Sequence, residues 1–197
     1  PKRDLPNAPL LKDRSELDRF IVSKLQSLIK NVNQEMDGYF LYKTIAPILN
    51  FIEDLTNWYI RRSRRRFWKS GATREERMDK LSAYATLYEV LTTFSKVLAP
   101  ILPFLSESIY QNLVVDTKMN KPGADSIHLT DFPEVDESKI DEILEHHTEI
   151  VRQIIAMGRA LREKYRIKNR QPLKKITVVT KDEDTIKALK SHEEIIA

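Results

Sequence analysis

Glycine is the residue that most constrains this chain, because only four of its 197 residues are glycine. A fold rich in β-hairpins needs many tight turns, and glycine adopts the positive φ angles of such turns most readily. Most of the chain instead carries apolar residues at helical spacing. The sequence therefore predicts a mainly α-helical fold, in which the first four helices form a bundle.

Apolar periodicity and capping residues predict helices at about 15–36, 73–98, 104–115 and 138–165, and a short one at 183–195. A further helix, the second in the chain, is predicted to end near residue 69. The second helix has two possible starts. Pro47 lies either in its first turn, with Thr44 as the cap, or inside a helix that begins near Tyr39. Thr73 and Glu76 form a capping box for the third helix, and Gly71 is a plausible stop for the second.

The C-terminal part has a different pattern. Residues 173–180 are β-branched and partly alternating, which predicts a strand in a small C-terminal α/β piece. Residues 127–129, in the long loop after the fourth helix, are expected to be a short extended piece. The predicted division is a lead-in at 1–14, a helical bundle at 15–165, and the start of an appendage at 166–197. We interpret the chain as a piece of a longer protein.

Charge is clustered along the chain, although the net charge is only +4. Residues 61–69 carry six positive and no negative charges, and residues 159–175 carry eight positive charges and one negative charge. Residues 131–149 show the opposite bias, with eight acids and one lysine. Clustered basic charge favours a polyanionic partner such as nucleic acid.

The segment 57–68, NWYIRRSRRRFW, can be divided on a helical wheel. One outward sector holds Asn57, Arg61, Arg64 and Trp68, with Arg65 beside it. Arginine supplies planar donors for phosphate, and tryptophan supplies a ring on which a base can stack. Trp58 falls on an apolar stripe, which favours core packing.

That apolar stripe ends in two arginines, Arg62 and Arg66. Since buried arginines need carboxylate partners, two interpretations are open. Either the helix leaves the bundle near residue 60, or these two side chains are structural and held by acids. The whole basic run also has a second, non-binding interpretation, as a charged helix end that pairs with the acids of 131–149.

A second basic segment joins the fifth helix to the predicted strand. We predict second-line phosphate contacts from Arg162, Arg166 and Arg170, although a solvated basic loop is an equally good interpretation. No catalytic residue is predicted, because nucleotide-binding glycine loops and nucleophile motifs are absent from the sequence. The chain has no cysteine, and its four histidines lack the spacing of a metal site. No metal or cofactor is therefore expected in this chain.

The segment NWYIRRSRRRFW resembles the signature helix of the anticodon-binding domain of isoleucyl-tRNA synthetases, which are class I aminoacyl-tRNA synthetases. Four further segments resemble elements of that family in the same order: DRFIVSKL at 18–25, LAPILPFLSESIY at 98–110, SIHLTDFP at 126–133, and Arg162 followed by RQPL at 170–173. The unbroken arginine run favours the isoleucyl over the related valyl enzymes. Phe132 departs from the tryptophan that is usual in the family, and Asn169 before Arg170 is a second departure.

The resemblance implies a function without catalysis in this chain. It implies a cytoplasmic parent ligase that joins isoleucine to its tRNA in protein synthesis, with ATP and Mg²⁺ bound in a catalytic domain outside this sequence. This chain would bind the anticodon stem-loop of tRNA(Ile), and neither DNA nor a membrane. The alternatives are the anticodon-binding domain of a valyl enzyme, and a helical protein-interaction module whose basic surface binds an acidic partner.

Overall fold

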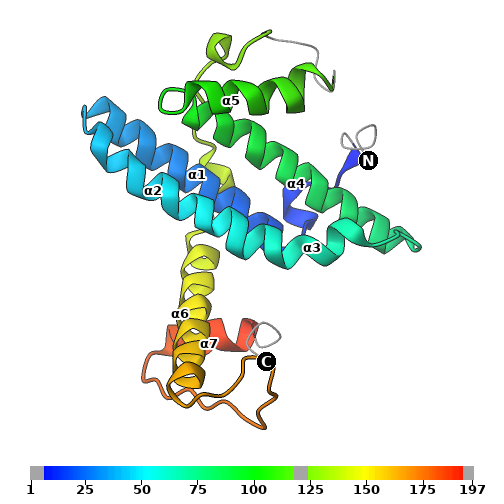
Figure 1. The fold of residues 1–197 in the computed structure, drawn as a ribbon, viewed down its shortest axis with the longest axis vertical. Helices are drawn as coiled ribbons and strands as arrows, with labels where there is room; N and C mark the ends of the chain where they lie inside the picture. The colour runs from blue at the N-terminus through cyan, green and yellow to red at the C-terminus, as the bar shows by residue number, and fades with distance from the viewer. Residues whose placement is uncertain (1–6, 118–123, 193–197) are drawn as a thin grey trace. The chain divides into compact units, whose positions relative to one another are not determined.

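The computed structural model describes residues 7–117 and 124–192 and divides the chain into two compact units, Pro1–Ile140 (unit 1) and Asp141–Ala197 (unit 2). The described residues are mainly α-helical, as predicted (Figure 1). None of the described helices is long and apolar enough to cross a membrane. The helices of unit 1 are α1 (Glu16–Asp37), α2 (Leu41–Glu53), α3 (Arg61–Trp68), α4 (Arg74–Leu98) and α5 (Pro103–Tyr110).

Helices α1 and α2 form an antiparallel hairpin at one end of unit 1 (Figure 1). The Ser15 hydroxyl caps α1 by accepting a hydrogen bond from the backbone N–H of Asp18. Pro47 lies inside α2, which begins at Leu41. The second of the two predicted starts, near Tyr39, is therefore confirmed.

A single helical path continues from α2 into α3, but its middle part is not α-helical. Residues Asp54–Ile60 form a π-helix, η3, and α3 follows without a break. Helix α3 packs against α4, and Ser63 in its middle is fully buried. The predicted departure of the helix from the bundle near residue 60 is therefore wrong, because the buried Asp18 and the partly exposed Asp79 accept hydrogen bonds from Arg66.

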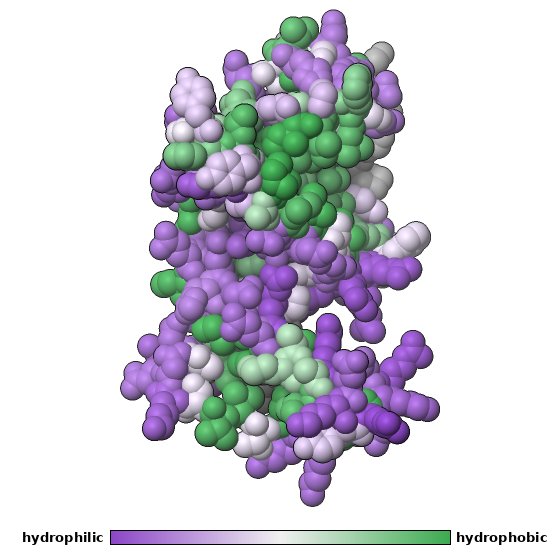
Figure 2. All heavy atoms as spheres, turned by 60° about the vertical axis from the view of Figure 1, so that its left-hand side comes forward, coloured by the Kyte–Doolittle hydropathy of each residue, from purple (hydrophilic) through white to green (hydrophobic). Residues whose placement is uncertain are grey.

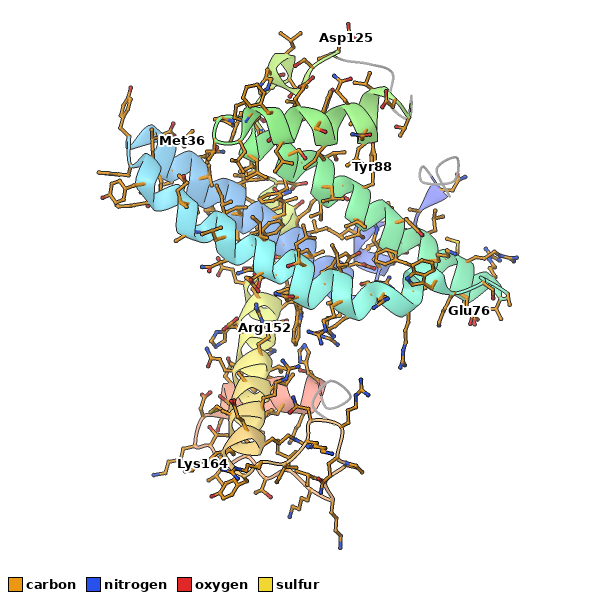
Figure 3. All side chains as sticks on the ribbon, viewed as in Figure 1. Met36, Glu76, Tyr88, Asp125, Arg152 and Lys164 are labelled. Carbon is orange, nitrogen blue, oxygen red and sulfur yellow. The ribbon has the colours of Figure 1, made fainter. Side chains whose placement is uncertain are left out.

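The turn between α3 and α4 has the predicted chemistry. Gly71 has φ 73°, a left-handed conformation that side chains rarely adopt. The hydroxyl of Thr73 accepts the N–H of Glu76, and the Glu76 carboxylate accepts the N–H of Ala72. Thr73 therefore caps α4 as predicted, but the Glu76 carboxylate binds the N–H before the cap and not that of Thr73 itself. Helix α4 starts next to the end of α3 (Figure 3, where Glu76 is labelled).

The core of unit 1 lies where α1, α2 and α4 meet. Phe51 of α2 and Phe94 of α4 pack with their rings tilted by 51° and their centroids 4.8 Å apart, beside buried apolar residues of α1. A smaller cluster lies under α5 and the π-helix η4 (Gln111–Val115) and includes Ile127. Ile127 belongs to a 3-10 turn, η5 (Ile127–Leu129), so the extended piece predicted there is wrong. Apolar side chains also gather on an outer face of unit 1 (Figure 2).

Unit 2 contains α6 (Glu142–Lys164) and α7 (Glu183–Ser191), which pack together. The predicted boundary at 165/166 would leave α6 in the bundle, whereas the contacts group α6 with α7. The strand predicted at 173–180 is wrong, since none of these residues is in a strand. A strand requires a neighbouring strand for its backbone hydrogen bonds, and no described segment pairs with this one. Val179 is 91% exposed as a result.

Candidate nucleic-acid interface

The inner side of α3 is held by a partly buried ionic cluster. The guanidinium of Arg66 donates to both oxygens of Asp18, at 2.9 Å from Nη1 and 2.6 Å from Nη2. Its Nε donates to Asp79 at 2.8 Å. We call Tyr59, Arg66, Asp18 and Asp79 the Arg66 cluster. The cluster confirms the prediction that Arg66 is structural and held by acids, although these acids come from α1 and α4 and not from 131–149.

Asp18 is fully buried and is the centre of this cluster. Its carboxylate also accepts from the hydroxyl of Tyr59 at 2.8 Å and from that of Ser15 at 2.8 Å. Burial, together with the charge of Asp18, raises the pKa of Tyr59. Burial opposes the charge on Arg66, but the hydrogen bonds and charges of Asp18 and Asp79 outweigh it and raise the Arg66 pKa. Tyr59 therefore stays neutral and Arg66 stays charged near neutral pH.

Arg62 has a different role from Arg66. Its guanidinium carbon lies 4.5 Å from the centroid of the Trp58 ring, in a cation–π contact. Burial lowers the Arg62 pKa, while the charge of Glu16 opposes that shift. Trp58 is half-buried, so its predicted packing role holds with one face covered by an arginine. No carboxylate within the described chain forms an ion pair with Arg62, unlike the prediction.

The other three arginines of α3 are exposed. Arg61, Arg64 and Arg65 have no hydrogen bond or ion pair with another described residue. Nitrogen-ended side chains project from α3 on the side away from α4 (Figure 3). Three exposed positive charges on one short helix, without partners in the described part of the chain, give this side of unit 1 a local positive field.

Asn57 and Trp68 complete the predicted outward sector. Asn57 is exposed, and its amide donates to the carboxylate of Glu53 one turn earlier. Trp68 is 80% exposed, which is unusual for the largest apolar side chain. The ring is available for stacking on a partner. We call Arg61, Arg64, Arg65 and Trp68, with Asn57 beside them, the α3 basic surface.

The three predicted residues of unit 2 do not behave alike. Arg162 donates from Nη1 to the backbone carbonyls of Lys168 at 3.1 Å and Gln171 at 2.8 Å. This side chain therefore holds the loop that follows α6. Arg166, at φ 55°, and Arg170 are exposed and have no side-chain partner among the described residues. Their guanidinium groups remain available, whereas that of Arg162 is engaged.

The structure also adds residues that the prediction missed. Asp18 and Asp79 are as important for α3 as its own arginines. Asp18 could have been found, because it shares the buried helical face of Ile21 and Leu25, and a buried acid requires a partner. The partner role of Asp79 has no such signal in the sequence. Among the described residues, no group of three or more acidic, histidine or cysteine side chains could hold a metal ion.

Comparisons with known proteins identify the family of this chain. The family described as "Anticodon-binding domain of tRNA ligase" matches residues 18–178, which include α3 and both basic segments. The chain is 45% identical to an isoleucine–tRNA ligase of Chlamydia muridarum over 88% of its length. It is 43% identical to the isoleucine–tRNA ligase of Chlamydia caviae over 93% of the length of this chain.

The matches cover only 16% and 17% of those two relatives. The relatives are enzymes, and this chain corresponds to their anticodon-binding region. The chain belongs to the family of anticodon-binding domains of tRNA ligases.

Proposed function

We propose that this chain binds the anticodon stem-loop of tRNA(Ile) as one domain of an isoleucine–tRNA ligase. The observation that carries the proposal is the α3 basic surface, where three exposed arginines without a partner among the described residues lie beside an 80% exposed tryptophan. The surface lies within the residues that match the family. The names of the relatives support isoleucine over valine as the amino acid.

Each part of the surface suits a different part of the RNA. The guanidinium groups of Arg61, Arg64 and Arg65 can each donate two hydrogen bonds to a phosphate. Trp68 can stack on a base that is turned out of the anticodon loop, which is how proteins generally read RNA loops. Arg166 and Arg170 are proposed as additional phosphate contacts. Arg162 acts on the RNA only through the loop that it holds.

The chain selects and orients the tRNA and does not itself make or break a bond. By holding the anticodon end, it would place the acceptor end of the tRNA at a catalytic domain elsewhere in the parent ligase. ATP and Mg²⁺ would bind in that catalytic domain. We propose that the parent acts in the cytoplasm, and that neither DNA nor a membrane is a partner.

Charge reversal of the surface tests the proposal. We expect the variant Arg61→Glu/Arg64→Glu/Arg65→Glu to lose measurable binding to a tRNA(Ile) anticodon stem-loop transcript. For the unmodified chain, affinity should fall steeply with salt, by a slope of about 0.7–0.9 per contacted phosphate on a log–log plot. Fluorescence anisotropy at several salt concentrations measures both quantities.

The control variant is Lys181→Glu/Lys187→Glu/Lys190→Glu, which changes the net charge by the same amount on exposed lysines of unit 2. It should bind within about threefold of the unmodified chain, because only non-specific attraction changes. Equal losses in both variants would contradict a specific α3 surface. A tighter complex with the tRNA(Val) stem-loop would favour the valyl alternative. Displacement of RNA by an acidic protein at physiological salt would favour the protein-interaction alternative.

A further inference from the structure

The Arg66 cluster and the α3 basic surface lie on different sides of the same eight-residue helix. At about 100° per residue, Arg61, Arg64 and Trp68 are roughly 140–160° away from Arg66 around the helix axis. The buried side of α3 therefore decides where the exposed arginines point. A rotation of α3 by one residue would move every guanidinium on the surface to a new direction.

The rotation of α3 is not the one that a regular α-helix continued from α2 would give. The seven residues before α3 form the π-helix η3, whose wider turn follows an i→i+5 hydrogen-bond pattern. An α-helix fixes its next turn by continuing the i→i+4 pattern, but a π-helix shifts that register. Contacts of α3 with its neighbours must match this shifted register and hold the orientation of α3 in unit 1.

The Arg66 cluster has the geometry for that task. The planar fork of Arg66 meets both oxygens of Asp18 on α1 and the side chain and backbone carbonyl of Asp79 on α4. A fork that engages two helices at once accepts one orientation only. Tyr59, two residues before α3, adds a hydrogen bond to the same Asp18. The cluster thus joins α3 to α1 and α4 on both sides of the η3–α3 junction.

We propose that Asp18, Arg66 and Asp79 are positioning residues for RNA binding. They do not touch the RNA. They hold α3 at the rotation in which Arg61, Arg64, Arg65 and Trp68 form one surface, so that this surface is organised before the RNA arrives. A preorganised surface loses less conformational freedom on binding. This inference rests on the proposed binding of the anticodon stem-loop.

The variant Asp18→Asn separates positioning from simple charge. The carboxylate of Asp18 accepts from Arg66, Tyr59 and Ser15, whereas an asparagine has one oxygen and an NH₂ group that would face donors. The variant also removes one negative charge from the protein. If electrostatic attraction to the RNA phosphates were the only effect, RNA binding would be equal or tighter. Positioning predicts the opposite: about tenfold or more weaker binding. Arg66→Lys, which keeps the charge and loses the fork, should weaken binding in the same direction.

Two readouts and one control distinguish positioning from lost stability. The salt slope should become shallower because fewer phosphates are reached at once. In a Trp58→Phe background, RNA should quench the emission of Trp68 less. Val90→Ala, a fully buried change in α4 outside the cluster, lowers stability but should leave affinity, slope and quenching unchanged. All variants are compared at temperatures where circular dichroism shows them folded.

Wild-type binding by Asp18→Asn and Arg66→Lys, or an equal loss in Val90→Ala, would overturn the inference. If both cluster variants fail to fold, Asp79→Asn replaces them, because it alters the more exposed of the two carboxylates. Normal binding by that variant would also overturn positioning. Failure of the proposed function looks different: the unmodified chain would then not bind the stem-loop, or the triple Arg→Glu variant would bind as well as the unmodified chain.

Discussion

Five neighbouring arginines of α3 have three different environments in this protein. Arg66 is mostly buried against two carboxylates, Arg62 covers the ring of Trp58, and Arg61, Arg64 and Arg65 are exposed. Removing one partner of a buried ion pair costs about 3–5 kcal/mol, because the other charge stays buried. An exposed arginine contributes little to folding. The same residue type thus serves stability at one position and is available for binding at another.

The two tryptophans provide a prediction at this scale. We expect Trp68→Ala to weaken binding of the anticodon stem-loop by about 1–3 kcal/mol, the range for one base stacked on an aromatic ring. The free energy of unfolding of this variant should differ from that of the unmodified chain by less than about 0.5 kcal/mol, since the ring is 80% exposed. Trp58→Ala should instead lower stability, because that ring is half-buried beneath Arg62. Urea unfolding and anisotropy measure the two effects, and weaker folding of Trp68→Ala would assign its ring to packing.

At the scale of elements, the short turn between α3 and α4 determines how the basic surface meets the bundle. Gly71 takes the left-handed conformation at the end of α3, and Thr73 caps α4 two residues later. Lys80 of α4 also donates to the backbone carbonyl of Lys69 at 2.8 Å. These contacts close the last turn of α3 beside α4, and Phe67 packs against Tyr84 with ring centroids 5.2 Å apart.

Two glycine substitutions should have opposite effects on stability. Gly71→Ala forces a side chain into φ 73°, where its Cβ would lie 2.8 Å from Cγ of Arg77. We expect a loss of about 1–2 kcal/mol. Gly158→Ala lies within α6, where the added Cβ would make an ordinary contact 4.0 Å from Cδ1 of Ile176, and should gain about 0.8–1 kcal/mol from helix propensity. Tryptophan emission reports unfolding of unit 1, and circular dichroism reports both units. A stabilising Gly71→Ala would contradict the left-handed turn.

At the scale of the whole molecule, the chain divides so that the α3 basic surface and everything that positions it belong to unit 1. The Arg66 cluster, the Phe51–Phe94 pair and the Thr73 cap all lie before residue 141. Unit 2 has its own contacts between α6 and α7, including His147 Nε2 at 3.2 Å from Asp184 Oδ1. The exposed Arg166 and Arg170 belong to unit 2.

A chain that ends at Ile140 should therefore remain folded. We expect cooperative unfolding, followed by tryptophan emission, with a midpoint close to that of the full chain. Its RNA affinity should be lower and its salt slope shallower by about 0.7–0.9 for each of Arg166 and Arg170 that contacts a phosphate. Non-cooperative unfolding would show that unit 1 depends on unit 2, as the predicted boundary at 165/166 implies. An unchanged salt slope would remove these two arginines from the binding surface.

Much of the fold followed from local patterns in the sequence. The periodicity of α1, the Thr73 cap of α4 and the glycine after α3 are properties of neighbouring residues, so they could be identified from the chain alone. The exposure of Arg61, Arg64, Arg65 and Trp68 also followed from helical periodicity, because that sector has no apolar partners. The strand at 173–180 failed because strand formation depends on a second segment, which the local pattern does not contain.

The sequence by itself determined that this protein is helical, that its basic charge is concentrated in two segments, and that one basic helix face points outward. Only the tertiary structure decided which arginines belong to that face. Arg66 differs from its neighbours because Asp18 and Asp79 approach it from α1 and α4, and Arg162 because two loop carbonyls fold back on it. Such partners are distant or irregularly spaced in the chain. The choice between a buried ion pair and an exposed charge therefore depends on packing, because burial makes an unpaired charge too costly.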